Sequence, residues 1–165
     1  MGQILSRTGE LEHVSLEVGT TAPEFALRSQ RREVVSLHDL RGSKAAIVFI
    51  PYAFTQTCQG ELCEIRDNLH RFNDSGVRVV AITCNTLHAN AAWSEQQGFT
   101  FDILSDFWPH GETARAYDSF DDKYGYATRT TYFLDEEGLI TGVTASEELG
   151  VARPFAAYEA MLSSS

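Results

Sequence analysis

Two cysteines and a threonine stand close together in the segment FTQTCQGELCEIR, residues 54–66. Cys58 and Cys63 are five residues apart, which fits neither the CxxC of a zinc knuckle nor the CxxC of a dithiol reductant. A cysteine thiolate is a nucleophile, and the hydroxyl of Thr55 stands three residues before Cys58. These residue types and this spacing favour nucleophilic chemistry at Cys58 and leave the role of Cys63 to be explained.

The elements around this segment place Cys58 at the start of a helix. The apolar run AAIVFI (45–50) predicts a central strand buried on both faces, and the apolar periodicity after it predicts a helix over about residues 57–74. A helix N-terminus carries partial positive charge and free N–H groups, so a thiol there loses its proton more easily. A free cysteine is often just a small buried apolar residue, but Thr55 and Pro51 favour chemistry here.

Helical geometry separates the two cysteines. At roughly 100° per residue, Cys58 projects onto the apolar stripe of the helix, and Cys63 lies about 140° away on the polar face. We therefore expect Cys58 inside the fold and Cys63 nearer to solvent or a partner. Residues five apart in an intact helix have Cα atoms about 8 Å apart, beyond the ~7 Å limit for a disulfide. A Cys58–Cys63 bond thus requires the first helical turns to unwind, and Gly60 weakens the helix between them.

The rest of the chain alternates strand and helix patterns. Strand patterns lie at 34–37, 77–83 and 101–104, helix patterns at 88–98, 109–120 and 154–162, and a hairpin at 130–145 with the turn EEG. This order predicts an α/β domain with a mixed central sheet flanked by helices. The length of 165 residues suits one domain, so we assign residues 1–18 to an N-terminal arm, loose or an edge strand, and 19–165 to the folded domain.

Composition and charge restrict the classes of partner and the cellular compartment that we expect. The net charge of −10 argues against binding to nucleic acid or to an anionic membrane surface. No stretch reaches the ~18 consecutive apolar residues of a membrane span, and the first residues lack the apolar core of a secretory signal. Three cysteines in a chain of this length predict free thiols in a reducing cytoplasm. We expect no metal site and no cofactor, because the histidines in the folded domain lack ligand spacing: His38, His70, His88 and His110.

The residues around Cys58 resemble a family signature. The stretch PYAFTQTC (51–58) matches the PxxxTxxC pattern of peroxiredoxins, and Arg129 in ATRTTYFLD resembles the family's second active-site arginine. The sequences AFTQTCQGEL, LSDFWPHGE and RTTYFLDEEG are similar to the alkyl hydroperoxide reductase E branch known from actinobacteria. The resemblance runs from about Gly19 to the C-terminus. It implies a thioredoxin fold with peroxiredoxin insertions and a thiol-dependent reduction of hydrogen peroxide and organic hydroperoxides.

The resemblance also implies a role for each matching residue. Cys58 would be the peroxidatic cysteine, and Thr55 would supply the hydroxyl that positions the peroxide. Pro51 would shield the thiolate from water, and Arg129 would be the cation that holds it. Glu61 matches the position that orients the arginine, and Trp93 matches an aromatic residue near the pocket. The chemistry agrees with these roles, because breaking an O–O bond needs an in-line nucleophile and donors aimed at the departing oxygen. Arginine supplies such donors and keeps its charge.

Cys63 departs from the E branch. Members of that branch usually act with one peroxidatic cysteine that an outside thiol resolves. A cysteine five residues later instead resembles the bacterioferritin comigratory protein branch, in which that cysteine resolves the sulfenic acid. We predict that Cys63 resolves Cys58, with resolution by an external thiol as the alternative. Cys84 is a third candidate, although a thiol at a strand end is more often structural.

The same residues leave several partners and alternative functions open. The reductant is a thioredoxin, a glutaredoxin-like protein or a low-molecular-weight thiol. A homodimer is expected, since family members often pair through loops near the pocket, and Phe107 and Trp108 are candidates for such an interface. A thiol–disulfide oxidoreductase is disfavoured by the absence of CxxC. A peroxide sensor, in which oxidation of Cys58 alters a partner's contacts, has no partner motif in its favour.

Overall fold

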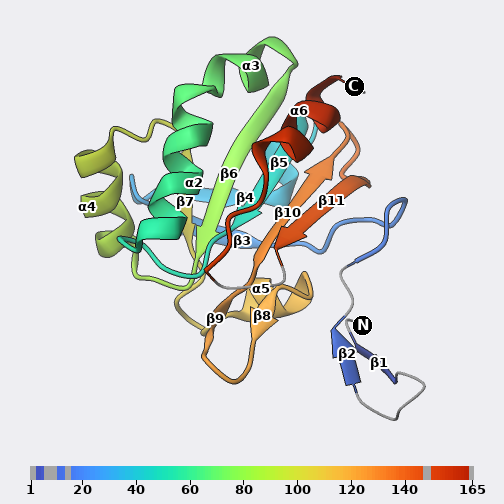
Figure 1. Ribbon diagram of the computed structural model, residues 1–165, viewed down its shortest axis with the longest axis horizontal. Helices are drawn as coiled ribbons and strands as arrows, with labels where there is room; N and C mark the ends of the chain where they lie inside the picture. The colour runs from blue at the N-terminus through green and yellow to red at the C-terminus, as the bar shows by residue number, and fades with distance from the viewer. Residues whose placement is uncertain (1–2, 6–10, 14–15, 147–149, 164–165) are drawn as a thin grey trace.

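A mixed sheet forms the centre of the molecule. The computed structural model describes residues 3–5, 11–13, 16–146 and 150–163. The strands of this sheet are β3 (Ala26–Ser29), β4 (Val34–Ser36), β5 (Lys44–Phe49), β6 (Val77–Thr83), β7 (Asp102–Ser105), β10 (Arg129–Leu134) and β11 (Ile140–Ser146). Within the described residues, seven strands pair in the order β11-β10-β5-β6-β7-β3-β4 (Figure 1). The central β5, β6 and β7 are parallel and the outer strands pair antiparallel, so the sheet is mixed, as the sequence predicts.

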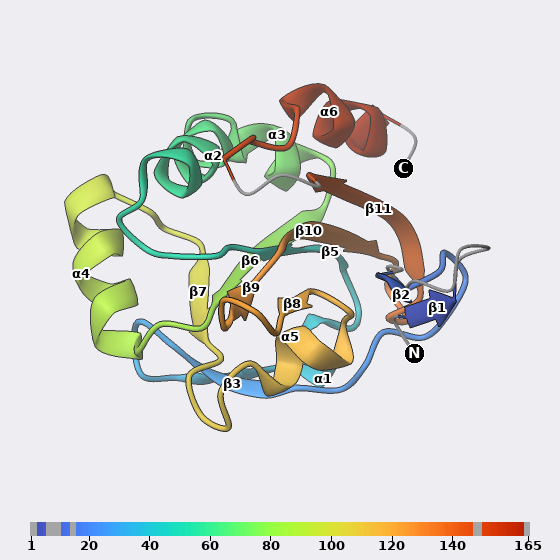
Figure 2. The ribbon, with the colours of Figure 1, turned by 60° about the horizontal axis from the view of Figure 1, so that its bottom comes forward.

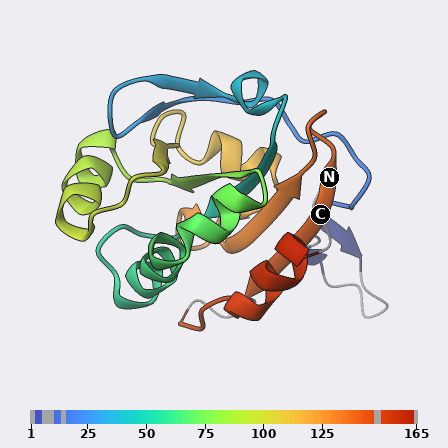
Figure 3. The ribbon, with the colours of Figure 1, turned by 90° about the horizontal axis from the view of Figure 1, so that it is seen from above.

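Helices cover both faces of the sheet (Figure 2). One face carries α2 (Gln56–Asp67), α3 (Leu69–Asp74) and α6 (Phe155–Ser163), and the other carries α1 (Leu37–Leu40) and α5 (Glu112–Ala116). The helix α4 (Leu87–Gln97) lies beside α2 at one edge (Figure 3). Among the described residues, no helix is both long and apolar enough to cross a membrane.

The strand β5 shows why this sheet needs both layers. Ala46 and Val48 pack in the cluster under α2, whereas Ala45, Ile47 and Phe49 pack in the cluster under α1 and α5. Successive side chains of a strand point to opposite faces, so a continuous apolar run is stable only between two covering layers. The prediction of a central strand buried on both faces is therefore confirmed.

Several other predicted elements are confirmed. The strand β6 has the predicted bounds, and β10 and β11 form the predicted hairpin. The helix α4 ends at Gln97, and Gly98, the last residue of the predicted helix pattern, adopts a left-handed φ of 71°. At its start, the hydroxyl of Thr86 accepts a hydrogen bond from the backbone N–H of Ala89 at 3.2 Å.

The single helix predicted over 57–74 is wrong, because Asn68 divides it into α2 and α3. The side-chain amide of Asn68 donates to the carbonyl oxygen of Glu64 at 2.8 Å. The backbone N–H of Asn68 still bonds to the same carbonyl at 3.2 Å, but Asn68 has φ −114° and ψ 15°, outside the helical conformation. The cysteines therefore lie on a shorter helix than the apolar periodicity indicates.

The helix predicted over 109–120 is also wrong beyond its centre, the five-residue α5. Gly111 before it and Asp118 after it have positive φ angles of 70° and 50°, which a right-handed helix cannot contain. The chain then forms a small hairpin of β8 (Phe120–Asp121) and β9 (Tyr126–Ala127). Gly111 is required at its position, because an added Cβ would lie 2.2 Å from the Phe120 ring.

The N-terminal arm contains the short strands β1 (Gln3–Leu5) and β2 (Leu11–His13). They pair with each other and not with the seven-stranded sheet, so in the described part of the arm there is no edge strand of that sheet. The boundary between arm and domain after residue 18 stays a prediction.

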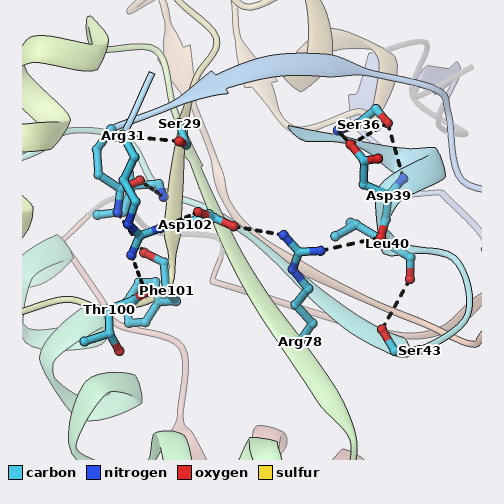
Figure 4. A network of polar contacts seen from close by, with 12 residues as sticks. Ser29, Arg31, Ser36, Asp39, Leu40, Ser43, Arg78, Thr100, Phe101 and Asp102 are labelled. Carbon is cyan, nitrogen blue, oxygen red and sulfur yellow. Dashed lines mark hydrogen bonds and ion pairs between the residues drawn. The ribbon is translucent and has the colours of Figure 1, made fainter. Parts of the chain in front are cut away.

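An ionic network joins the strand ends that are remote from the cysteines (Figure 4). Asp102 at the start of β7 binds Arg31 at 2.6 Å and Arg78, near the start of β6, at 3.0 Å. Arg31 also donates to the carbonyl oxygen of Thr100 at 2.6 Å. Because β5, β6 and β7 are parallel, their other ends meet at the opposite edge, where β5 leads into the segment of Cys58.

Candidate active site

The loop between β5 and α2 is held in a defined shape. Pro51 is buried, and the backbone N–H of Ala53 donates to Asn85 Oδ1 at 2.9 Å, which ties the loop to the chain beyond β6. Phe54 has a φ of 67°, uncommon for a bulky residue, and Thr55 is the N-cap of α2. The loop therefore fixes where the first turn of α2 begins.

Cys58 lies in that first turn and is fully buried. It packs in the apolar cluster between the sheet and α2, beside residues of β5 and α2 such as Val48 and Leu62. The placement predicted from the helical projection is confirmed. A helix N-terminus presents free N–H groups and a partial positive charge to the residues of its first turn.

Glu61, one helical turn after Cys58, holds two arginines in the interior. Its side chain is 2% exposed, and those of Arg129 and Arg153 are 3% and 0% exposed. Glu61 Oε1 accepts from Arg129 Nη1, and Glu61 Oε2 accepts from Arg153 Nε at 2.8 Å. The group carries a net charge of +1, because two guanidinium groups face one carboxylate. We call these three residues the Glu61 clamp.

Arg153 has further partners that fix its orientation. Its Nη1 donates to the carbonyl oxygen of Phe49 at 2.9 Å and to Thr131 Oγ1 at 3.2 Å. Burial opposes its charge, yet the interactions with Tyr158 and with the Glu61 carboxylate raise the pKa of Arg153 above its ordinary value. The guanidinium therefore stays charged in the interior.

Sequence reasoning missed Arg153 altogether. It stands 92 residues after Glu61 in the segment VARPF, where no spacing or motif connects the two. The single available signal is an arginine between apolar residues just before the last helix, and that signal is weak.

The other expected site residues lie around the loop and α2. Thr55 is exposed at the helix start, and its hydroxyl donates to the carbonyl oxygen of Tyr52 at 3.2 Å. Trp93 of α4 is buried, its ring centroid is 6.1 Å from that of Phe54, and its Nε1 donates to Gln59 Oε1 at 3.2 Å. The structure thus brings Glu61 to Arg129 and Trp93 to the loop of Thr55.

Cys63 lies on a different side of α2 from Cys58. It is half-buried, packs at the border of the same apolar cluster, and its Sγ is 3.5 Å from Gln97 Oε1. The predicted separation of the two cysteines is confirmed, although Cys63 faces α4 rather than open solvent. All the cysteines are free thiols.

Cys84 is not part of this arrangement. It is buried in the cluster on the other face of the sheet, with Phe49 and Tyr117. Burial, together with the carboxylate of Asp106, raises the pKa of Cys84 to about 12. This thiol is therefore neutral and shielded, as expected of a structural cysteine.

The sequence is similar to a described protein family and to individual proteins of that kind. A model of the AhpC/TSA family matches residues 18–143. Alkyl hydroperoxide reductase E of Mycobacterium tuberculosis (strain ATCC 25618 / H37Rv) is 44% identical over 126 residues, which are 76% of this chain and 82% of that protein. A putative peroxiredoxin bcp of Coxiella burnetii is 33% identical over 136 residues, which are 79% of this chain and 89% of that protein.

Solved structures show the same fold. Peroxidoxin BcpB from Mycobacterium tuberculosis superposes with a TM-score of 0.78 at 24% identity, covering 90% of this chain and 95% of that one. Enterococcus faecalis AhpC gives a TM-score of 0.82 at 21% identity, covering 89% and 90%. The architecture is a thioredoxin-like α/β fold with a mixed sheet between helices.

Proposed function

The chain belongs to the AhpC/TSA family, and from that premise we propose that Cys58 is the residue that attacks the peroxide. The protein is a peroxiredoxin, a thiol-dependent peroxidase that reduces hydroperoxides. The Cys58 thiolate attacks one peroxide oxygen and forms an S–O bond while the O–O bond breaks. The other oxygen leaves as hydroxide or alkoxide and takes up a proton, and Cys58 becomes a sulfenic acid.

The Glu61 clamp is the observation that supports this assignment most. It is buried, carries a net positive charge and includes the residue one turn after Cys58 on the same side of α2. A fixed cation in a dry site stabilises a thiolate and the charge that develops on the departing oxygen. In this proposal Arg129 donates to the reacting atoms, and Glu61 and Arg153 hold Arg129 in place.

Thr55 and Pro51 complete the proposed site. The hydroxyl of Thr55 stands at the exposed end of α2, where a peroxide would arrive, and serves as its hydrogen-bond partner. Buried Pro51 has no backbone N–H and keeps water from the thiolate. Trp93 supports the loop from the side of α4.

We propose that Cys63 then resolves the sulfenic acid. The thiol of Cys63 loses its proton, its sulfur bonds to the sulfur of Cys58, the S–O bond breaks, and the products are a disulfide and water. Because the two residues lie on different sides of an intact helix, the first turns of α2 must unwind before the sulfurs can meet. Resolution by an external thiol is the alternative.

Mass spectrometry after one equivalent of hydrogen peroxide tests both steps. We expect the parent to show a disulfide that peptide mapping assigns to Cys58 and Cys63, and Cys63→Ser to show a sulfenic acid at Cys58. Cys58→Ser should consume no peroxide. If Cys58→Ser consumed peroxide at the parent rate, Cys58 would not be the nucleophile. A persistent Cys58 sulfenic acid beside a free Cys63 in the parent would contradict the resolver role alone.

The partners are proposed from the same chemistry. A thiol reductant must return the disulfide to two thiols, and we propose a cytoplasmic thioredoxin, glutaredoxin-like protein or low-molecular-weight thiol. We also propose a homodimer, because three large apolar side chains are exposed, Trp108 at 82%, Phe54 at 50% and Phe107 at 47%. Sedimentation of the parent and of Trp108→Glu tests the dimer: a parent that stays monomeric at micromolar concentration contradicts it.

A further inference from the structure

Three contacts join one side of α2 to α4. Gln59 accepts from Trp93 Nε1 at 3.2 Å, the Cys63 Sγ lies 3.5 Å from Gln97 Oε1, and Arg66 Nη1 donates to the carbonyl oxygen of Gln97 at 2.6 Å. The three α2 positions are spaced by four and then three residues, which places them along one face of a helix. We call this line of contacts the α2–α4 seam.

The seam fixes the direction of the Cys63 thiol. An amide oxygen carries no proton, so in the contact with Gln97 the S–H of Cys63 is the donor. The thiol therefore points toward α4, whereas Cys58 is enclosed in the cluster between α2 and the sheet. Unwinding the helix start is not sufficient for resolution, because the Cys63 thiol must also leave Gln97.

Gln97 is itself held firmly. It is the last residue of α4, the left-handed Gly98 ends the helix directly after it, and its own carbonyl oxygen accepts from Arg66. The side-chain oxygen thus reaches Cys63 from an anchored backbone. Figure 3 shows α2 and α4 lying beside each other at this edge of the sheet.

We propose that Gln97 is a positioning residue that holds the Cys63 thiol against α4 in the reduced enzyme, and that breaking this contact is part of the resolution step. This inference rests on the proposed resolver role of Cys63. The contact favours the intact α2 that Cys58 needs for attack on peroxide, and it slows disulfide formation afterwards. Gln97 therefore influences how much peroxide the enzyme tolerates before a second peroxide converts the sulfenic acid to a sulfinic acid.

The test measures the rate of Cys58–Cys63 disulfide formation after one equivalent of hydrogen peroxide, by acid quench and mass spectrometry. Gln97→Met keeps the size of the side chain but removes the acceptor. We expect its disulfide to form about two- to tenfold faster than in the parent, the range for one lost hydrogen bond. Half over-oxidation of Cys58 should require correspondingly more peroxide. The matched control is Gln96→Met, an exposed neighbour on the same helix, which should match the parent.

A second variant separates this role from a general loosening of the seam. Gln97→Glu keeps an acceptor oxygen at the same place, so its disulfide should form no faster than the parent's. If Gln97→Met and Gln97→Glu were both faster by the same factor, the acceptor oxygen would not be what holds Cys63. If the Cys58–Cys63 disulfide formed in Gln97→Met at the parent rate, the role of Gln97 would be overturned and the resolver role of Cys63 would stand. If the parent forms no Cys58–Cys63 disulfide, both proposals fail.

Discussion

Arg153 holds Glu61 through two separate groups: its Nε lies 2.8 Å and its backbone N–H lies 2.9 Å from the same oxygen, Glu61 Oε2. The second contact means that the main chain before α6, and not only a side chain, is fixed to the helix of Cys58. A carboxylate held in this way cannot rotate freely, so its other oxygen presents a constant partner to Arg129. The C-terminal segment thereby sets the geometry of a site whose signature lies far earlier in the chain.

Arg153→Met should destabilise the protein strongly. The substitution leaves the buried Glu61 carboxylate with one arginine instead of two, and removing a partner from a buried ion pair costs about 3–5 kcal/mol. Urea denaturation measures the loss in the free energy of unfolding. Arg71→Met is the matched control, because Arg71 and Glu159 form a pair at 3.5 Å with side chains 40% and 48% exposed. Its cost should be at most about 1 kcal/mol. Equal losses in the two variants would contradict the importance of burial here.

Arg129→Met should slow the oxidation of Cys58 by peroxide. In the proposed mechanism Arg129 donates to the departing oxygen. Deleting a comparable hydrogen-bond donor from the active site of another enzyme costs about 2.7–4 kcal/mol, roughly 10²- to 10³-fold in rate. Single-turnover kinetics with limiting peroxide measures this step apart from reduction. Arg115→Met is a suitable control, because Arg115 is exposed and pairs with the exposed Asp122. An unchanged oxidation rate in Arg129→Met would remove Arg129 from the mechanism.

Cys84 should be inert in the folded protein. Burial and Asp106 raise its pKa to about 12, so at pH 8 the thiolate is almost absent and reagents have little access. The sign is clear: a raised thiol pKa lowers reactivity at every pH below that value. Mass spectrometry after iodoacetamide treatment of the reduced, folded protein should find Cys63 modified well before Cys84, and Cys84→Ala should keep most peroxidase activity. Modification of Cys84 at the rate of Cys63 would show that it is accessible.

The sequence was sufficient for elements whose signal is local. The apolar run of β5 and the turn at 136–138 each specify their structure through nearby residues, and both were predicted. The helix break at Asn68 was not predicted, because apolar periodicity continues across it while the backbone of Asn68 leaves the helical conformation. The region 109–120 reads as a helix until Gly111 and Asp118 are seen in left-handed conformations.

The residues of the site also differ in whether a local sequence signal predicts them. Cys58 and Thr55 lie within one short motif, and helical geometry places Cys58 inside and Cys63 elsewhere. Arg153 and Gln97 could not be found, because their importance comes from contacts with α2 across 92 and 34 residues. No local pattern encodes such a contact when a single polar side chain makes it.

Gly60→Ala should make resolution slower and the enzyme more sensitive to peroxide. Gly60 lies between the two cysteines on the exposed side of α2, and an added Cβ there would meet no atom within 4 Å. Alanine stabilises an exposed helix position by about 0.5–1 kcal/mol relative to glycine. If the first turns of α2 must unwind before the sulfurs meet, the disulfide should form about two- to fivefold more slowly, by the same free energy.

A slower disulfide leaves the sulfenic acid of Cys58 exposed to a second peroxide for longer. Titration with peroxide in the presence of a reductant, followed by mass spectrometry, should therefore find half of Cys58 as sulfinic acid at a lower concentration in Gly60→Ala than in the parent. Glu64→Ala is the matched control, since it changes an exposed residue of the same helix just beyond Cys63. If Gly60→Ala formed its disulfide at the parent rate, unwinding of this turn would not limit the reaction, and Cys63 would have to reach Cys58 by another movement.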